Sequence, residues 1–509
     1  MRIVLGVVLA LVLTAGPVAA AADPKLIRQV DSYRRAHEIA IVGELDALTR
    51  IRSVAADPAG IAAAASHLEG LLKARGFETA QIGVPGSMPV VFGSLTVAGA
   101  RRTVVFYAHY DGQPVTPSEW ASDPFVPVMR SGPLGHGERS VDWRNAKTPL
   151  DPEWRLFGRA VADDKTPIIA FLTAFDALKS ARRSPSVNIK VVWEGEEEAG
   201  SPHLTAILRK NSARLKSDLW IIGDGPVHQS QRRMITFGAR GVVGLELTIY
   251  GPLRAPHDGH YGNWVPNPAA MAAELIAGLR ASDGRILIPG FLDEVRPITS
   301  AESTAVASLP PVEDQLRREL GIARSESADG LTASILRPAV NVRGIHAGRV
   351  GAQAVNAIPT HAAVSIDFRL VPDQTPAHAR RTVEAYLRAQ GWTIVSEPPD
   401  STMRRTHHRI VKLDWEGGYP AFRSDMNTPA ARAVIAAAKV AGGGPIALMP
   451  MMGGSVPIYM FDEEFHVPVI GLPVVNHDNN QHAANENIRL QNLWDGITTY
   501  AAMMAGLDW

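Results

Sequence analysis

A histidine and an aspartate stand two residues apart where an apolar run ends, in the order His109-Tyr110-Asp111-Gly112. The run, Val104–Ala108, is rich in β-branched and aromatic residues, which indicates a buried strand of a parallel sheet. Side chains two apart on a strand point to the same side, so an imidazole and a carboxylate would form half of a zinc site. Alone, such a pair is more often a hydrogen-bonded strand end.

Three further acidic clusters have the form of loops next to strands or helices. Asp163 and Asp164 precede an apolar helix, where two carboxylates could simply be helix caps. Four glutamates crowd into Glu194–Glu198 after an apolar strand, and they repel each other unless a cation is present. A solvated acidic turn is the alternative. Asp224 follows the strand Leu219–Ile222 and by itself would be a turn residue.

The C-terminal part of the chain adds His466, His477 and His482, each of which alone would be an ordinary exposed histidine. Two histidines and several carboxylates from separate strand ends would together form a two-metal site. The chain has no cysteine, so any metal must be held by His, Asp and Glu. That donor set suits Zn²⁺, and Mn²⁺ or Co²⁺ would tolerate it.

Composition and the N-terminus limit the class of protein. The 51 basic and 51 acidic residues give a formal net charge of zero, which does not suggest nucleic-acid binding. Arg2, the apolar run Ile3–Leu13 and the small residues Pro17–Ala22 have the pattern of a signal peptide over residues 1–22. We therefore expect a secreted or periplasmic protein. The apolar run is too short for a membrane span, and no later stretch qualifies.

The 509 residues are too many for one core, so two or more domains are expected. Up to Gly238 strands alternate with helices, which predicts an α/β catalytic domain with a mainly parallel sheet (23–238). The next part has a β-α-insertion-β-α-β order and predicts a small α+β domain inserted into the first (239–415). A helix at 429–441 and strands near 446 and 467–471 would return to the parent sheet (416–509).

Taken together, the motifs resemble those of a known family over nearly the whole mature chain. The set resembles the co-catalytic zinc metallopeptidases, which include carnosinase-like dipeptidases, acetylornithine and succinyl-diaminopimelate deacylases, aminoacylases and glutamate carboxypeptidases. The dipeptidase branch is the nearest. The motifs, in the family's order, are His-x-Asp-Gly (109–112), Gly-Arg-x-x-x-Asp-Asp-Lys (158–165), Glu-Gly-x-Glu-Glu-x-Gly-Ser (194–201), the strand-end Asp224, Gly-Gly-Ser-x-Pro (453–457) and His-x-x-Asn-Glu (482–486).

The resemblance implies a dinuclear zinc site with five ligands. His109 and Asp224 would hold one ion, Glu198 and His482 the other, and Asp163 would bridge both.

Two further residues of the site have implied roles without binding metal. Asp111 would orient His109. Glu197 would be the general base, which takes a proton from a metal-bridging water and later gives it to the leaving amine.

The inserted domain resembles the family's ferredoxin-like lid and dimerisation domain. The implied role of His257 is to reach the partner subunit's site in a homodimer and stabilise the oxyanion. Arg369 would bind the substrate carboxylate, for which a planar guanidinium is suited, and Ser455 would line the same pocket. A loop histidine and a surface ion pair are the alternatives for His257 and Arg369.

The sequence departs from the family pattern at three places. Thr166 stands where a glycine usually follows Asp-Asp-Lys, and Asp258 replaces the usual serine beside the lid histidine. Met451 and Met452 stand where carnosinase-like members carry Arg-Glu, which makes the substrate end of the site more apolar. The substrate specificity therefore cannot be inferred from that of carnosinase.

The function favoured by these motifs is hydrolysis of a peptide bond in dipeptides or short peptides that have a free C-terminal carboxylate. The first alternative is an N-acyl-amino-acid amidohydrolase on the same metal core. A binding protein that has lost catalysis is a second alternative, but neither Glu197 nor any predicted ligand is missing.

Overall fold

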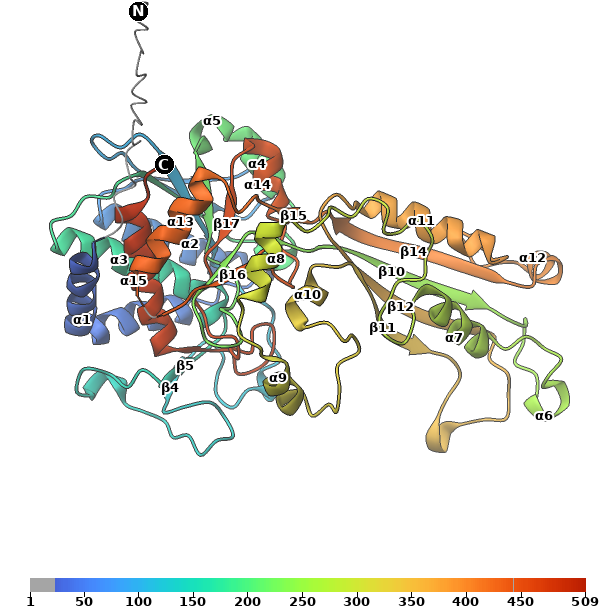
Figure 1. The fold of residues 1–509 in the computed structure, drawn as a ribbon. Coiled ribbons are helices and arrows are strands. Elements are labelled where there is room, and N and C mark those ends of the chain that lie inside the picture. The colour runs from blue at the N-terminus through green and yellow to red at the C-terminus, as the bar shows by residue number, and fades with distance from the viewer. Residues whose placement is uncertain (1–22, 443) are drawn as a thin grey trace, which may run out of the picture.

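The chain forms two bodies, each built on its own sheet (Figure 1). The structure, a computed structural model, describes residues 23–442 and 444–509, so the predicted signal peptide lies outside the described residues. The larger body combines the beginning and the end of the chain, and most of the middle of the chain forms the smaller, elongated body. A helix from the middle, Ser300–Ala307, packs against the larger body, where Ala305 joins its core. None of the helices in the described part of the chain combines the length and the apolar character needed to cross a membrane.

The larger body contains a mixed sheet of eight strands. Their order is β1 (Glu78–Ile82), β2 (Val90–Leu95), β6 (Asn188–Glu194), β3 (Thr103–His109), β7 (Leu219–Ile222), β17 (Val469–Gly471), β8 (Met234–Thr236) and β16 (Ala447–Met449). The central strands β6, β3, β7 and β17 are parallel, and β8 pairs in parallel with β16. The other three pairings are antiparallel. The predicted α/β class with a mainly parallel sheet is confirmed.

The register of the central strands brings their carboxyl ends to one edge. His109, the last residue of β3, lies opposite Glu194, the last residue of β6. Tyr107 lies opposite Ile222 at the end of β7, so Asp224 is level with His109. This is the edge where open α/β sheets bind their ligands.

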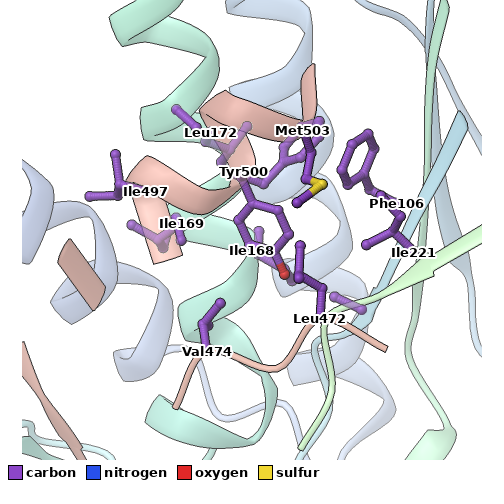
Figure 2. Close-up of a cluster of buried hydrophobic side chains, with 14 of the residues drawn as sticks. Phe106, Ile168, Ile169, Leu172, Ile221, Leu472, Val474, Ile497, Tyr500 and Met503 are labelled. Carbon is purple, nitrogen blue, oxygen red and sulfur yellow. The ribbon is translucent and has the colours of Figure 1, made fainter. Parts of the chain in front are cut away.

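Helices cover the large sheet and form its core. They are α1 (Pro24–Arg50), α2 (Pro58–Ala74), α3 (Thr166–Ser180), α13 (Pro429–Val440) and α15 (Leu490–Gly506). Figure 2 shows α3 and α15 packed together over the sheet, with Tyr500 and Met503 beside Phe106 of β3. The Phe106 and Tyr500 ring centroids are 6.0 Å apart. This packing fixes β3, and therefore the position of His109.

The smaller body has five strands in the order β11 (Ala339–His346), β12 (His361–Leu370), β10 (Gly241–Tyr250), β14 (Ile410–Tyr419) and β13 (Thr393–Val395). Alternate residues of β10, such as Val243, Leu245 and Leu247, are buried in a core shared with α7 (Pro268–Leu279) and α11 (Pro376–Ala389). α7 and α11 cover this buried face, and Arg369 lies on the opposite face of the sheet.

Two parts of the chain differ from the sequence-based expectations. The insertion within the predicted β-α-insertion-β-α-β order, for which the sequence predicts no regular elements, contains α8 (Ser300–Ala307), α9 (Glu313–Leu320), α10 (Leu331–Ile335) and β11. Residues 114–151 are rich in Pro, Gly and charged residues, which predicts a loop. They nevertheless contain β4 (Val128–Arg130), which joins β5 (Arg155–Phe157) and β18 (Asn487–Arg489) in a small sheet. The strands β11 and β4 form by pairing with other strands, which local patterns do not reveal.

The two bodies are connected through a short two-stranded sheet, β9 (Gly238–Ala239) with β15 (Phe422–Arg423). The boundary expected at 238/239 falls inside β9, and that expected at 415/416 falls inside β14, which continues to Tyr419. The remaining helices are α4 (Leu204–Lys210), α5 (Ser212–Leu215), α6 (Asp258–Tyr261), α12 (Ser401–Thr406) and α14 (Tyr459–Phe465).

Candidate metal centre

Six side chains at the carboxyl edge of the large sheet form two groups whose donor atoms lie close enough to hold a metal ion. Within each group the donor atoms are within 4.8 Å of one another. The first group is His109, Glu197 and Asp224, and the second is Asp163, Glu198 and His482. All five predicted ligands and the predicted general base are therefore brought together, although their roles stay predictions.

Asp163 lies between the two groups. Its Oδ1 is 3.0 Å from Nε2 of His109, and its Oδ2 is 3.1 Å from Nε2 of His482. His482 also lies 3.3 Å from Oε2 of Glu198. One carboxylate thus faces both groups, as the bridging role predicted for Asp163 requires.

Asp111 is fully buried and contacts the end of β3 and the turn that follows β6. Its Oδ1 lies 3.4 Å from Nδ1 of His109. Its carboxylate also accepts hydrogen bonds from the backbone N–H groups of Glu197, at 3.3 Å, and Glu198, at 3.0 Å. One carboxylate therefore orients the imidazole and the glutamate turn together, which extends the role predicted for it.

Burial and like charges perturb the acidic groups of the centre. Burial raises the pKa of Glu198 to about 7 and that of Asp224 to about 6, and the charge of Asp163 adds to both shifts. Burial also raises the pKa of Glu197 well above its usual range; His109 opposes this shift, while Asp224 and Glu198 add to it. These carboxylates are costly to ionise together in the protein alone.

The residues present fit divalent metal ions. The two groups contain four carboxylates against two imidazoles, so the protein supplies too little positive charge to balance them. Oxygen and nitrogen donors without a thiolate suit Zn²⁺, Mn²⁺ or Co²⁺. Because each group has three donors within reach of one ion, two ions would be accommodated, with Asp163 shared between them.

The predicted substrate-binding residues form a second polar group. Arg369 of β12 donates from Nη1 to Oγ of Ser455 at 2.8 Å and from Nε to Oδ2 of Asp367 at 2.7 Å. Tyr419, at the end of β14, lies near both this group and the metal centre. Burial raises the pKa of its phenol, Glu197 adds to the shift and Arg369 opposes it. The structure therefore brings Arg369 and Ser455 together where the two bodies meet.

His257 lies away from these residues. It caps α6, which occupies the end of the smaller body farthest from the large sheet (Figure 1). Its side chain is about half exposed and lies 3.6 Å from Asp258. A role for His257 at the metal centre of its own chain is not compatible with this position, whereas the predicted role at a partner's centre requires an exposed tip.

Sequence reasoning missed two residues that contact the ligand set. Gln113 donates from Nε2 to Oε2 of Glu198 at 2.6 Å, and Glu486 accepts the backbone N–H of Asp163 at 2.9 Å. Glu486 belongs to the His-x-x-Asn-Glu motif, so its spacing from His482 was a usable signal. Nothing in the sequence around Gln113 sets it apart from an ordinary loop residue.

Comparisons with known proteins agree on one family. The model of peptidase family M20/M25/M40 matches residues 105–506. The chain is 26% identical over 420 residues to the Cys-Gly metallodipeptidase dug1 of Schizosaccharomyces pombe, covering 81% of each chain. It is also 26% identical over 421 residues to the human Beta-Ala-His dipeptidase, covering 81% of this chain and 76% of that one.

Solved structures share the fold. The M20 family metallo-carboxypeptidase Sso-CP2 from Sulfolobus solfataricus superposes with a TM-score of 0.73 at 25% identity, covering 91% of this chain and 98% of that one. Human carnosine dipeptidase 1 also has a TM-score of 0.73, at 23% identity, covering 95% of this chain and 98% of that one.

Proposed function

Since this chain belongs to peptidase family M20/M25/M40 and is a metallopeptidase, we propose that it hydrolyses the peptide bond of dipeptides or short peptides that have a free C-terminal carboxylate. The dipeptidase names of its relatives support this substrate class. The observation that carries the proposal is the position of Asp163, whose two oxygens face His109 and His482 in two separate ligand groups.

The proposed mechanism assigns each residue a separate task. Two divalent ions, proposed to be zinc, would polarise the scissile carbonyl and lower the pKa of the attacking water. Glu197 would accept the proton of that water and pass it to the leaving amine. A raised pKa of the Glu197 carboxyl favours the first transfer, because it makes the carboxylate a stronger base.

The substrate carboxylate would bind to Arg369 and Ser455. Nη1 of Arg369 already donates to the Ser455 hydroxyl, and Asp367 holds Nε, so the guanidinium plane is fixed before substrate binds. A fixed planar fork recognises a carboxylate with two parallel hydrogen bonds.

We propose that a second copy of the chain completes the site through the tip of the smaller body. His257 pairs across a β-bridge with Ala357, and two large apolar side chains near this bridge are strongly exposed, Trp264 at 80% and Val355 at 63%. Such exposed apolar groups favour an interface. In a homodimer, His257 would reach the partner's centre and stabilise the oxyanion.

Hydrolysis of N-acyl amino acids is the alternative that one observation favours. The methyl group of Met452 lies against the Asp224-Gly225 turn, 3.1 Å from where a Cβ on Gly225 would lie. An apolar wall at this place would tolerate an acyl chain on the amine side of the scissile bond.

Export after cleavage of residues 1–22 is also part of the proposal, and N-terminal sequencing of the cell-made protein tests it.

A substrate panel tests the proposed function. The metal-loaded protein is assayed on dipeptides, N-acetyl amino acids and longer N-acyl amino acids, each with and without a chelator. We expect chelator-sensitive hydrolysis with a higher kcat/KM for dipeptides. A higher kcat/KM for N-acyl amino acids would replace the proposal by the alternative, and no cleavage of any class with metal bound would contradict both.

A further inference from the structure

Glu486 is a buried carboxylate with four hydrogen-bond donors directed at it. Its side chain is fully buried. Oε1 accepts the backbone N–H groups of Ala162 and Asp163, each at 2.9 Å. Oε2 accepts the backbone N–H of Ala160 and Nη1 of Arg159, each at 2.8 Å. The mechanism derived above gives this residue no task.

The segment that donates these bonds is irregular. Ala160 has a left-handed backbone (φ +61°), and Asp163 (φ −110°, ψ 87°) departs from helical geometry before α3 begins. Backbone N–H groups in such a segment lack the regular partners of a helix or a strand, and buried donors must be satisfied. The Glu486 carboxylate satisfies three of them, and charge-assisted bonds of this kind are stronger than neutral ones.

Glu486 also fastens the segment to the loop that carries His482. Arg159, which is 2% exposed, donates from Nη1 to Glu486 and from Nη2 to the carbonyl of Ala483 at 3.0 Å. The backbone carbonyl of Glu486 accepts the N–H of Gly158 at 3.0 Å. The two segments that supply Asp163 and His482 are therefore joined by a buried ion pair and five further hydrogen bonds, three of them from backbone N–H groups to the Glu486 carboxylate.

We infer that Glu486 is a positioning residue that sets the distance between the two ligand groups. Asp163 must present one oxygen to each group, so a small displacement of its backbone disturbs both contacts at once. Glu486 holds that backbone and, through Arg159, the His482 loop. The inference rests on the proposed metal centre but not on the proposed substrate, because metal binding is measured without substrate.

The test uses two matched substitutions of fully buried glutamates. Glu486→Gln keeps the shape of the side chain. Its amide NH₂ cannot accept a hydrogen bond, so two of the four donors lose their acceptor. Glu38→Gln is the control: Glu38 is also fully buried, pairs with Arg34 and accepts the N–H of Leu150, and none of these residues is a predicted ligand. Co²⁺ affinity is measured by competition with a chelator, and the visible spectrum of bound Co²⁺ reports its geometry.

We expect Glu486→Gln to weaken Co²⁺ binding about 10- to 100-fold at one or both sites, as loss of a partner behind a metal ligand does, and to change the Co²⁺ spectrum. Its kcat should fall while KM changes little. Glu38→Gln should lower the Tm without either metal effect. Wild-type affinity and spectrum in Glu486→Gln, or equal losses in both variants, would overturn the inference and leave Glu486 a role in stability alone.

If Glu486→Gln does not fold, Arg159→Lys provides the second test. Lysine keeps the charge but has a single side-chain nitrogen. It cannot contact both Glu486 and the Ala483 carbonyl as the planar guanidinium of Arg159 does. We expect a smaller but measurable loss of Co²⁺ affinity. Unchanged affinity in Arg159→Lys would overturn the proposed link to the His482 loop. If the variants show the expected losses of Co²⁺ affinity but the wild-type protein cleaves no peptide, the proposed function is contradicted and this inference is not.

Discussion

Arg369 donates a hydrogen bond of 2.8 Å from Nη1 to the Ser455 hydroxyl, and this contact joins the smaller sheet to a turn of the larger body. Ser455 follows β16 in the Gly-Gly-Ser turn, so the two residues come from different bodies and meet where the bodies join. A substrate carboxylate bound there, as proposed, would contact both bodies.

Arg369→Lys is expected to raise KM about tenfold or more while kcat changes less, because a hydrogen bond to a charged group contributes about 1.5–3 kcal/mol. Steady-state kinetics on a dipeptide checks this. Arg343→Lys is the control, since Arg343 lies on the same small sheet and pairs with Glu246 and Glu416. An unchanged KM in Arg369→Lys would remove Arg369 from carboxylate recognition.

Glu197→Gln is expected to lower kcat about 10²–10⁴-fold, because the amide cannot accept the proton of the attacking water. Metal content should remain near that of the wild type, since the five predicted ligands are unchanged. Elemental analysis and kinetics on the same preparation check both parts. Loss of one metal equivalent would instead make Glu197 a ligand, in keeping with its place beside His109 and Asp224.

Gly195→Ala is expected to destabilise the protein by about 1–3 kcal/mol and to lower kcat. A Cβ at this position would lie 2.4 Å from the Tyr110 hydroxyl and 3.0 Å from the Pro89 carbonyl, so the glutamate turn must shift. Gly70→Ala in α2 has nothing within 4 Å of the new methyl group and should be neutral or stabilising. Chemical denaturation of both variants provides the comparison, and equal stabilities would disprove the close packing behind the turn.

His257→Ala is expected to lower kcat about 10²–10³-fold with little change in metal content, as loss of an oxyanion donor does. His260→Ala is the matched control, because its ring centroid is only 4.9 Å from that of His257. Mixing His257→Ala with an inactive Glu197→Gln chain should restore part of the activity if the histidine acts across a dimer. No restoration together with a normal rate for His257→Ala alone would refute the role.

The strand ends could be predicted because local patterns determine them. The apolar runs before His109 and Glu194 and the run Leu219–Ile222 are short and lead into the candidate ligands, and the structure forms β3, β6 and β7 there. Since parallel strands end at one edge, the meeting of His109, Glu198 and Asp224 followed from the order of the elements.

Features that depend on distant segments could not be predicted in this way. β14 ends in Gly417-Gly418-Tyr419, which is poor strand sequence, and it is held by pairing with β10 rather than by propensity. The four donors around Glu486 come from a segment more than 300 residues earlier in the chain. The motif located Glu486, but only the structure shows what it contacts.

We expect each of the two ligand groups to hold a metal ion on which hydrolysis depends. Metal-free protein is titrated with Zn²⁺ while metal content and dipeptide hydrolysis are measured on the same samples. We expect two equivalents per chain, an activity that rises with occupancy, and a higher Tm in the loaded protein because the cations balance the buried carboxylates. Fewer than two equivalents at saturation, or full hydrolysis in the metal-free protein, would contradict this expectation.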